Sequence, residues 1–167
     1  MRFQLVGSLT LLAVGVIGRL VPHPPNFTPV EATALFAGAW LSNIWLGLAV
    51  PLSVMALTDA ILGWHSLWPY TWGAMSAGVI LGRYLMQKQR LLSVAGTAIA
   101  QATLFFLVTN FGLWTTGAYG YSLSGLIACY EAAVPFYHYQ VLGALFYSGL
   151  FWVVEYTLLR HLQVAPR

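Results

Sequence analysis

The chain has 167 residues, of which 59% are hydrophobic and only 7% are charged, whereas soluble domains carry about 25% charged residues. A core of this size cannot hide so much apolar surface from water, so the composition excludes an ordinary soluble domain and predicts an all-α integral membrane protein, with residues 1–167 as a single transmembrane domain. The formal net charge of +3 comes from basic residues near segment ends, and we expect no nucleic-acid partner.

The first predicted span covers residues 3–20, and we interpret it as a retained helix because no small-residue cleavage site follows it. A proline-rich connector, the proline loop, then runs over residues 19–31 and holds four of the eight prolines, which fix φ and remove backbone donors. So stiff a loop indicates that a group is held there. Thr28 is predicted to cap the next helix, and Glu31 to lie at its positive end.

The apolar stretch over residues 30–62 admits two interpretations. Ser42 and Asn43 are a possible turn between two short spans, or Pro51 is a kink in one long tilted helix. We prefer the turn, because a single helix of that length would measure about 50 Å, which is more than tilt normally absorbs.

Further spans are predicted at residues 70–86, 91–109 and 141–159. A short interfacial helix over residues 126–134, closed by Pro135, is expected before the last of them. The chain is therefore predicted to have six transmembrane helices, two of them short.

The distribution of basic residues sets the sidedness. The cluster between Arg83 and Arg90 and the C-terminal Arg160 and Arg167 are expected in the cytoplasm, which places the C-terminus there. With six spans the proline loop, the loop around His65 and the third connection all face the other side. With five spans the proline loop is cytoplasmic.

Polar residues of these three connections are the candidate substrate-binding residues, because ionisable groups in apolar sequence are functional candidates by default, the alternative being a solvated or helix-capping role at the interface. They are His23, Asn26 and Thr28 from the first, Asp59 and His65 from the second, and Asn110, Trp114, Cys129, Tyr130 and Glu131 from the third.

No pair of these residues has metal-ligand spacing, and no nucleophile lies beside a base or in a catalytic motif. We therefore expect no metal, no cofactor and no enzymatic activity. The lone cysteine, Cys129, allows no internal disulfide. A face of small residues, Ala32, Ala37, Gly38 and Ala39, is predicted to let a helix approach closely, within this chain or in a partner.

Several motifs together resemble a family of small bacterial membrane proteins classed as substrate-binding (S) components of energy-coupling-factor (ECF) transporters. The motifs are residues 22–29 (PHPPNFTP), 34–39 (ALFAGA), 58–65 (TDAILGWH), 105–112 (FFLVTNFG) and 125–130 (GLIACY). The likeness runs from about residue 12 to 150. The usual alanine-spaced pattern of the first helix is absent, since Ala13 stands alone there.

This resemblance implies a six-helix S-component fold in the bacterial inner membrane, with substrate held under the first, third and fifth loops. It also implies docking of an alanine-rich face on a transmembrane coupling subunit powered by two ATPases. The predicted function is uptake of a small polar nutrient, such as a vitamin, a vitamin precursor or a metal complex. The alternative is an accessory subunit of a larger membrane complex.

Overall fold

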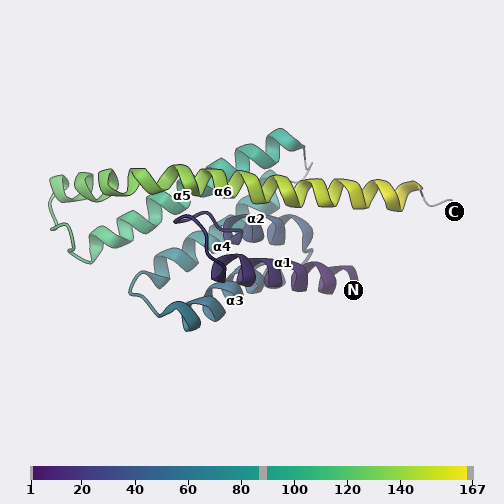
Figure 1. Ribbon diagram of the computed structural model, residues 1–167, viewed down its shortest axis with the longest axis horizontal. Coiled ribbons are helices and arrows are strands. Elements are labelled where there is room, and N and C mark those ends of the chain that lie inside the picture. Colours follow the sequence, from purple (N-terminus) through teal and green to yellow (C-terminus); the bar gives the residue numbers. More distant parts are fainter. Residues whose placement is uncertain (1, 87–89, 165–167) are drawn as a thin grey trace.

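The structure is a computed structural model that describes residues 2–86 and 90–164. In these ranges the chain forms six helices and no strand. The helices are α1 (Arg2–Leu20), α2 (Val30–Trp40), α3 (Ile44–Leu62), α4 (Trp68–Leu85), α5 (Leu91–Thr115) and α6 (Leu123–Val164). Successive helices run in alternating directions, so the α1–α2, α3–α4 and α5–α6 connections lie at one end of the bundle and both termini at the other (Figure 1).

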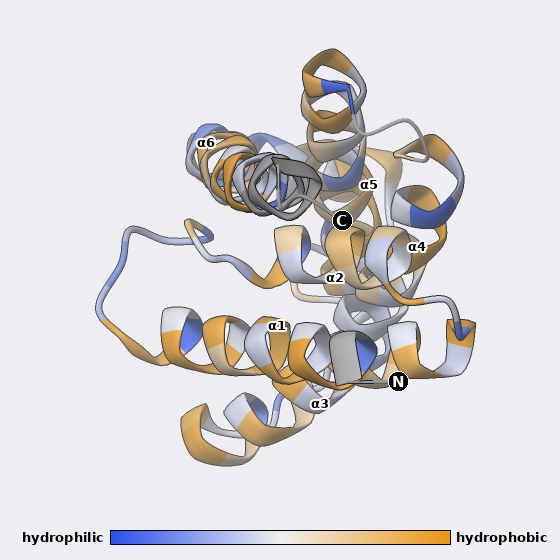
Figure 2. Cartoon of the chain, turned by 90° about the vertical axis from the view of Figure 1, so that its right-hand side faces the viewer, coloured by the Kyte–Doolittle hydropathy of each residue, from blue (hydrophilic) through white to orange (hydrophobic). Residues whose placement is uncertain are grey.

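Helix α2 is the centre of the bundle, surrounded by the other helices when viewed end-on (Figure 2). All of its residues from Val30 to Gly38 are buried. It touches α4 through backbone, because a Cβ on Gly38 would lie 2.0 Å from the Val79 carbonyl oxygen and one on Gly82 1.9 Å from that of Leu35. Only hydrogen fits at these two positions, so the two helices cross in direct contact.

The small-residue face of α2 therefore packs inside the chain. Ala32 and Ala37 are completely buried, Gly38 lies against α4, and Ala39 is half-buried. This face is not exposed to a partner, which corrects its prediction as a docking surface and leaves the alternative, close packing within the chain.

The turn predicted at Ser42 and Asn43 is confirmed, since α2 ends at Trp40 and α3 begins at Ile44. The Asn43 side chain caps α3 by accepting a 2.8 Å hydrogen bond from the Trp45 N–H. Pro51 lies inside α3 and does not interrupt it. Thr28 is not a cap: the N-cap of α2 is Pro29, which makes no side-chain bond to the helix.

The predicted short helix ending at Pro135 is wrong, because α6 continues through that proline over 42 residues. An internal proline removes its own N–H bond and crowds the carbonyl four residues earlier, here that of Glu131, at a cost of about 3 kcal/mol. Extensive packing of α6 along α5 offsets a defect of that size.

Helix α5 also runs six residues past its predicted end at 109. Asn110 continues the helix and donates its side-chain amide to the Phe106 carbonyl at 2.8 Å. Gly112 is not a stop signal but a packing residue, since a Cβ there would lie 2.4 Å from the Tyr70 ring. The chain turns only afterwards, at Gly117 and Gly120, with φ of 80° and 74°.

Two of the described helices, Ile44–Leu62 and Leu91–Thr115, are long and apolar enough to cross a membrane. Large apolar side chains also cover much of the outer surface: Leu92 is 86% exposed and Trp45 75%. Figure 2 shows the same apolar character on the outer faces of several helices.

Candidate functional site

A cavity of about 180 Å³ lies beneath the proline loop. All of the first five helices or their connections contribute to its wall. The lining residues are Arg19, His23, Asn26, Thr28, Val30, Glu31, Met55, Leu62, Thr71, Met75 and Phe105. Polar groups come mainly from the end of α1, the proline loop and the start of α2, whereas α3, α4 and α5 supply mainly apolar ones.

The C-terminal part of the proline loop is held against the bundle by two contacts. Proline 29 packs on α1, where a Cβ at Gly18 would lie 2.3 Å from its ring. Phe27 packs on α6, with ring centroids 5.8 Å from Phe146 and 5.6 Å from Tyr147. Asn26, directly before Phe27, takes a φ of 62°, a left-handed conformation that asparagine tolerates. The loop is thus an ordered roof that places Asn26 and Thr28 on the cavity.

The side chain of His23 contacts the backbone of the same loop through both of its ring nitrogens. Its Nδ1 donates to the Pro24 carbonyl oxygen at 2.8 Å, and its Nε2 lies 3.3 Å from the Arg19 carbonyl oxygen. Both ring nitrogens therefore face carbonyl groups, and His23 contributes the body of its ring to the cavity wall.

Beside the cavity lies a buried ionic centre around Asp59, which is 1% exposed. One carboxylate oxygen lies 2.6 Å from an Arg19 guanidinium nitrogen. The other accepts a 2.9 Å hydrogen bond from the Trp72 indole and lies 3.6 Å from Nε2 of His65. Arg19 also donates to the Thr58 hydroxyl. This centre ties the end of α1 to α3 and α4, and its carboxylate is matched by a cation and a hydrogen-bond donor.

Glu31 is a second buried carboxylate, and it lines the cavity itself. It is 5% exposed. Its Oε1 accepts a 2.6 Å hydrogen bond from the Gln140 side chain, whose amide also donates to the Ala102 carbonyl at 3.2 Å. Its Oε2 has no hydrogen-bond partner among the described residues. Buried polar atoms are normally paired, so this buried and unpaired oxygen is an exception among the described residues.

The candidate residues of the third connection do not line this cavity. Cys129 is buried and lies 3.4 Å from the Asn110 carbonyl oxygen, and the Tyr130 hydroxyl donates to the Leu107 carbonyl at 2.7 Å. Glu131 is exposed on α6.

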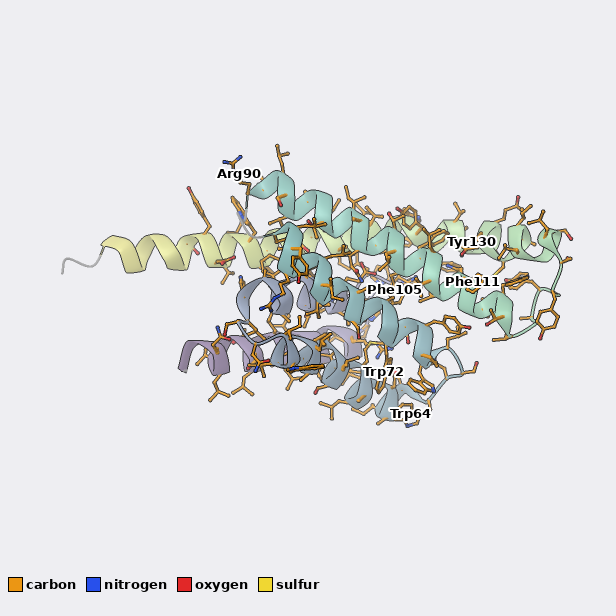
Figure 3. All side chains as sticks on the ribbon, turned by 180° about the vertical axis from the view of Figure 1, so that it is seen from behind. Trp64, Trp72, Arg90, Phe105, Phe111 and Tyr130 are labelled. Atoms are coloured by element: carbon orange, nitrogen blue, oxygen red, sulfur yellow. The ribbon has the colours of Figure 1, made fainter. Side chains whose placement is uncertain are left out.

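Trp114 packs against Phe111 in a tilted arrangement, their ring centroids 5.6 Å apart. Figure 3 shows Phe111 and Tyr130 further along the α5–α6 pair than Phe105, which lines the cavity. Trp72 binds Asp59 of the ionic centre, and Trp64 packs on Trp72 with ring centroids 6.0 Å apart. The structure thus brings together the candidates of the first two connections and leaves the third group apart.

Sequence reasoning missed several residues of the site. Arg19 was interpreted as a basic residue at a span end, and Glu31 as a charge at a helix start. An acid surrounded by alanines in an apolar run was the available signal for Glu31. Nothing in the sequence pointed to Gln140, which lies 109 positions from the carboxylate it binds.

The described chain is thus an all-helical bundle with two helices apolar enough to cross a membrane and a partly polar cavity at one end. It belongs to DUF6580, a family of unknown function, which it matches over residues 1–165. No curated protein and no solved structure matches it.

Proposed function

We propose that this chain is a six-span protein of the bacterial inner membrane that captures a small polar nutrient in the cavity beneath the proline loop, in the manner of an ECF S component. The loop and the cavity face outward, and the C-terminus is cytoplasmic. The observation that carries the proposal is the cavity itself, which has a partly polar wall and lies under the proline loop.

The membrane location is supported by the distribution of polarity. Glu31, Asp59, Gln101 and Gln140 are buried, whereas many large apolar side chains are exposed over the bundle. In water this arrangement would leave extensive apolar surface unfavourably solvated, and in lipid it is the expected one. The alternating helix directions support six spans, with the short α2 protected from lipid by its neighbours.

Topology is testable with single cysteines in a Cys129→Ala background. Asn26 and Ser42 are both exposed and lie at opposite ends of α2. Six spans predict that an impermeant maleimide added to intact cells labels Asn26→Cys but not Ser42→Cys. Labelling of both, or of Ser42→Cys alone, contradicts this topology.

The size of the cavity supports a ligand with about one ring. An engineered protein cavity of roughly 150 Å³ binds benzene, so about 180 Å³ accommodates a single ring with a substituent. The polar wall, with Asn26, Thr28 and Thr71, would orient such a molecule, and Met55 and Phe105 would contact its apolar part.

Binding is tested by a thermal-shift screen of vitamins, nucleobases and metal complexes on the purified protein. A ligand at a hundred times its Kd adds about 2.7 kcal/mol of stability. Thr71→Trp, which fills the cavity, should abolish the shift, and Thr157→Trp on the exposed face of α6 should retain it. Failure of every compound, or an equal response from both variants, would count against a binding protein.

A second function, an accessory subunit of a larger membrane complex, is favoured by one feature of α6. This helix extends past the other helices at the C-terminal end (Figure 1), and Val153 and Val154 on it are 49% and 43% exposed. Extraction in mild detergent separates the possibilities. Co-migration with a coupling subunit and two ATPases supports the transporter, co-migration with another assembly supports the accessory role, and a lone species that binds a nutrient supports independent capture.

A further inference from the structure

We infer that the ligand of the cavity is a small monocarboxylate carried on one ring, with its carboxylate bound by Arg19. This inference rests on the proposed function and names the class of its substrate. It starts from the guanidinium of Arg19, whose residue lines the cavity and whose side chain is 19% exposed.

Arg19 uses only one of its side-chain nitrogens within the described chain. Nη1 lies 2.6 Å from the Asp59 carboxylate and also donates to the Thr58 hydroxyl. Among the described residues neither Nε nor Nη2 has a hydrogen-bond partner, and neither belongs to the buried polar atoms that lack one, so both are accessible. These two nitrogens form one edge of the planar guanidinium, and such an edge binds a carboxylate through two parallel hydrogen bonds.

A ligand carboxylate at this edge does not need to displace Asp59. One oxygen of Asp59 contacts Nη1, while the other accepts from the Trp72 indole at 2.9 Å and lies 3.6 Å from Nε2 of His65. The ion pair therefore stays in place while the other edge of the guanidinium is occupied. Because Asp59 repels a second anion, one negative charge on the ligand is favoured over two.

The neighbouring wall is also suited to an anion. Glu31 lines the cavity, but its Oε1 accepts from Gln140 and its Oε2 has less than 1 Å² of accessible surface, so neither oxygen is both unpaired and accessible. Helix α2 begins at this wall, and its N-cap, Pro29, supplies no side-chain acceptor to the first N–H groups. The positive end of the helix adds to the attraction that Arg19 exerts on an anion.

The apolar part of the wall sets the body of the ligand. Met55, Leu62, Met75 and Phe105 line the cavity with aliphatic, sulfur and aromatic surface, which favours an apolar ring. The volume of about 180 Å³ limits the ligand to about one ring with a substituent. A ring that carries one carboxylate combines these features.

The test uses three one-ring probes that differ in charge: benzoate, benzamide and benzylamine. Their affinities for the full-length protein in nanodiscs are measured by calorimetry at neutral pH, with empty nanodiscs as the blank. Benzoate should bind at least about tenfold more tightly than benzamide, because charge-assisted hydrogen bonds are roughly twice as strong as neutral ones, and benzylamine should bind most weakly.

Two matched variants locate the carboxylate. Arg19→Lys keeps a positive charge beside Asp59 but removes the guanidinium edge, so it should weaken benzoate binding at least about tenfold. Arg83→Lys should retain it, because Arg83 donates to the Leu41 and Ser42 carbonyls at the other end of α2. If Arg19→Lys does not fold, Arg19→Met/Asp59→Asn removes both charges of the pair and should show the same loss.

The outcomes separate the two levels of the proposal. If benzamide or benzylamine binds as tightly as benzoate and Thr71→Trp blocks it, the cavity is a binding site but the carboxylate inference is overturned. Unchanged benzoate affinity in Arg19→Lys overturns it as well, as does a nutrient screen whose ligands carry no carboxylate. If none of the probes binds and the nutrient screen is also negative, the proposed function fails together with the inference.

Discussion

The bundle contains two buried carboxylates, Asp59 and Glu31, which differ in their partners. Asp59 is paired with Arg19 and receives the Trp72 indole hydrogen. Glu31 has one partner, Gln140, and one open oxygen. The first arrangement contains an ion pair and joins three helices. The second has no ion pair among the described residues, so the two acids differ in how much each is expected to stabilise the bundle.

The largest effect is expected from breaking the ionic centre. Asp59→Asn leaves the Arg19 guanidinium without its counter-charge, which should lower the free energy of unfolding by about 3–5 kcal/mol. Denaturant unfolding in detergent micelles measures it, with Glu131→Gln as the control that removes an exposed carboxylate. The double variant Arg19→Met/Asp59→Asn should recover part of the loss, and additive losses would argue against a direct pair.

A smaller effect is expected from removing the indole donor. Trp72→Phe deletes the hydrogen bond to Asp59 and should cost about 1.5–3 kcal/mol, the range for hydrogen bonds to charged groups. Trp68→Phe is the matched change, because Trp68 packs on Trp72 with ring centroids 5.5 Å apart and is 47% exposed. Equal losses from both variants would mean that ring packing, not the hydrogen bond, stabilises the centre.

His65 contributes less to the same centre. Its Nε2 lies 3.6 Å from the Asp59 carboxylate, and its side chain is 35% exposed, so solvent weakens the interaction. His65→Asn should therefore change unfolding by less than about 1 kcal/mol. A loss as large as that of Trp72→Phe would show that the imidazole is a principal partner of Asp59.

The smallest effect on stability is expected at the open carboxylate. Glu31→Gln keeps an oxygen that accepts from Gln140 and replaces the unpaired Oε2 with an amide group of similar shape. Unfolding should change by less than about 1 kcal/mol in either direction, since the lost interaction and the relieved burial oppose each other. A loss of unfolding free energy comparable to that of Asp59→Asn would show that Glu31 stabilises the bundle as strongly as Asp59 does.

Local signals in the sequence identified most of the helices. The break before α3 was predictable because Ser42 and Asn43 are turn and capping residues in a stretch too long for one span. Pro135 misled the prediction, because a proline signals a break locally and cannot show that packing along α5 maintains the helix.

The candidate site was predictable only in part, for the same reason. The proline loop, His23, Asn26 and Thr28 stand out by composition, and the structure places them on the cavity. Whether a buried acid has hydrogen-bond partners depends on residues far away in the chain, such as Gln140 for Glu31. The sequence does not show which distant residues are hydrogen-bonded to each other. It therefore predicts Glu31 only as a charged residue at the start of a helix.

The backbone contact between α2 and α4 has a consequence for the evolution of DUF6580 proteins. At Gly38 and Gly82 a single methyl group would collide with a carbonyl of the opposite helix, whereas Gly73 and Gly96 have open space around them. Homologues that keep this crossing should hold glycine at the first two positions and drift freely at the other two. An alignment of relatives would thus show whether this helix crossing is preserved across the family, whatever the function of each member.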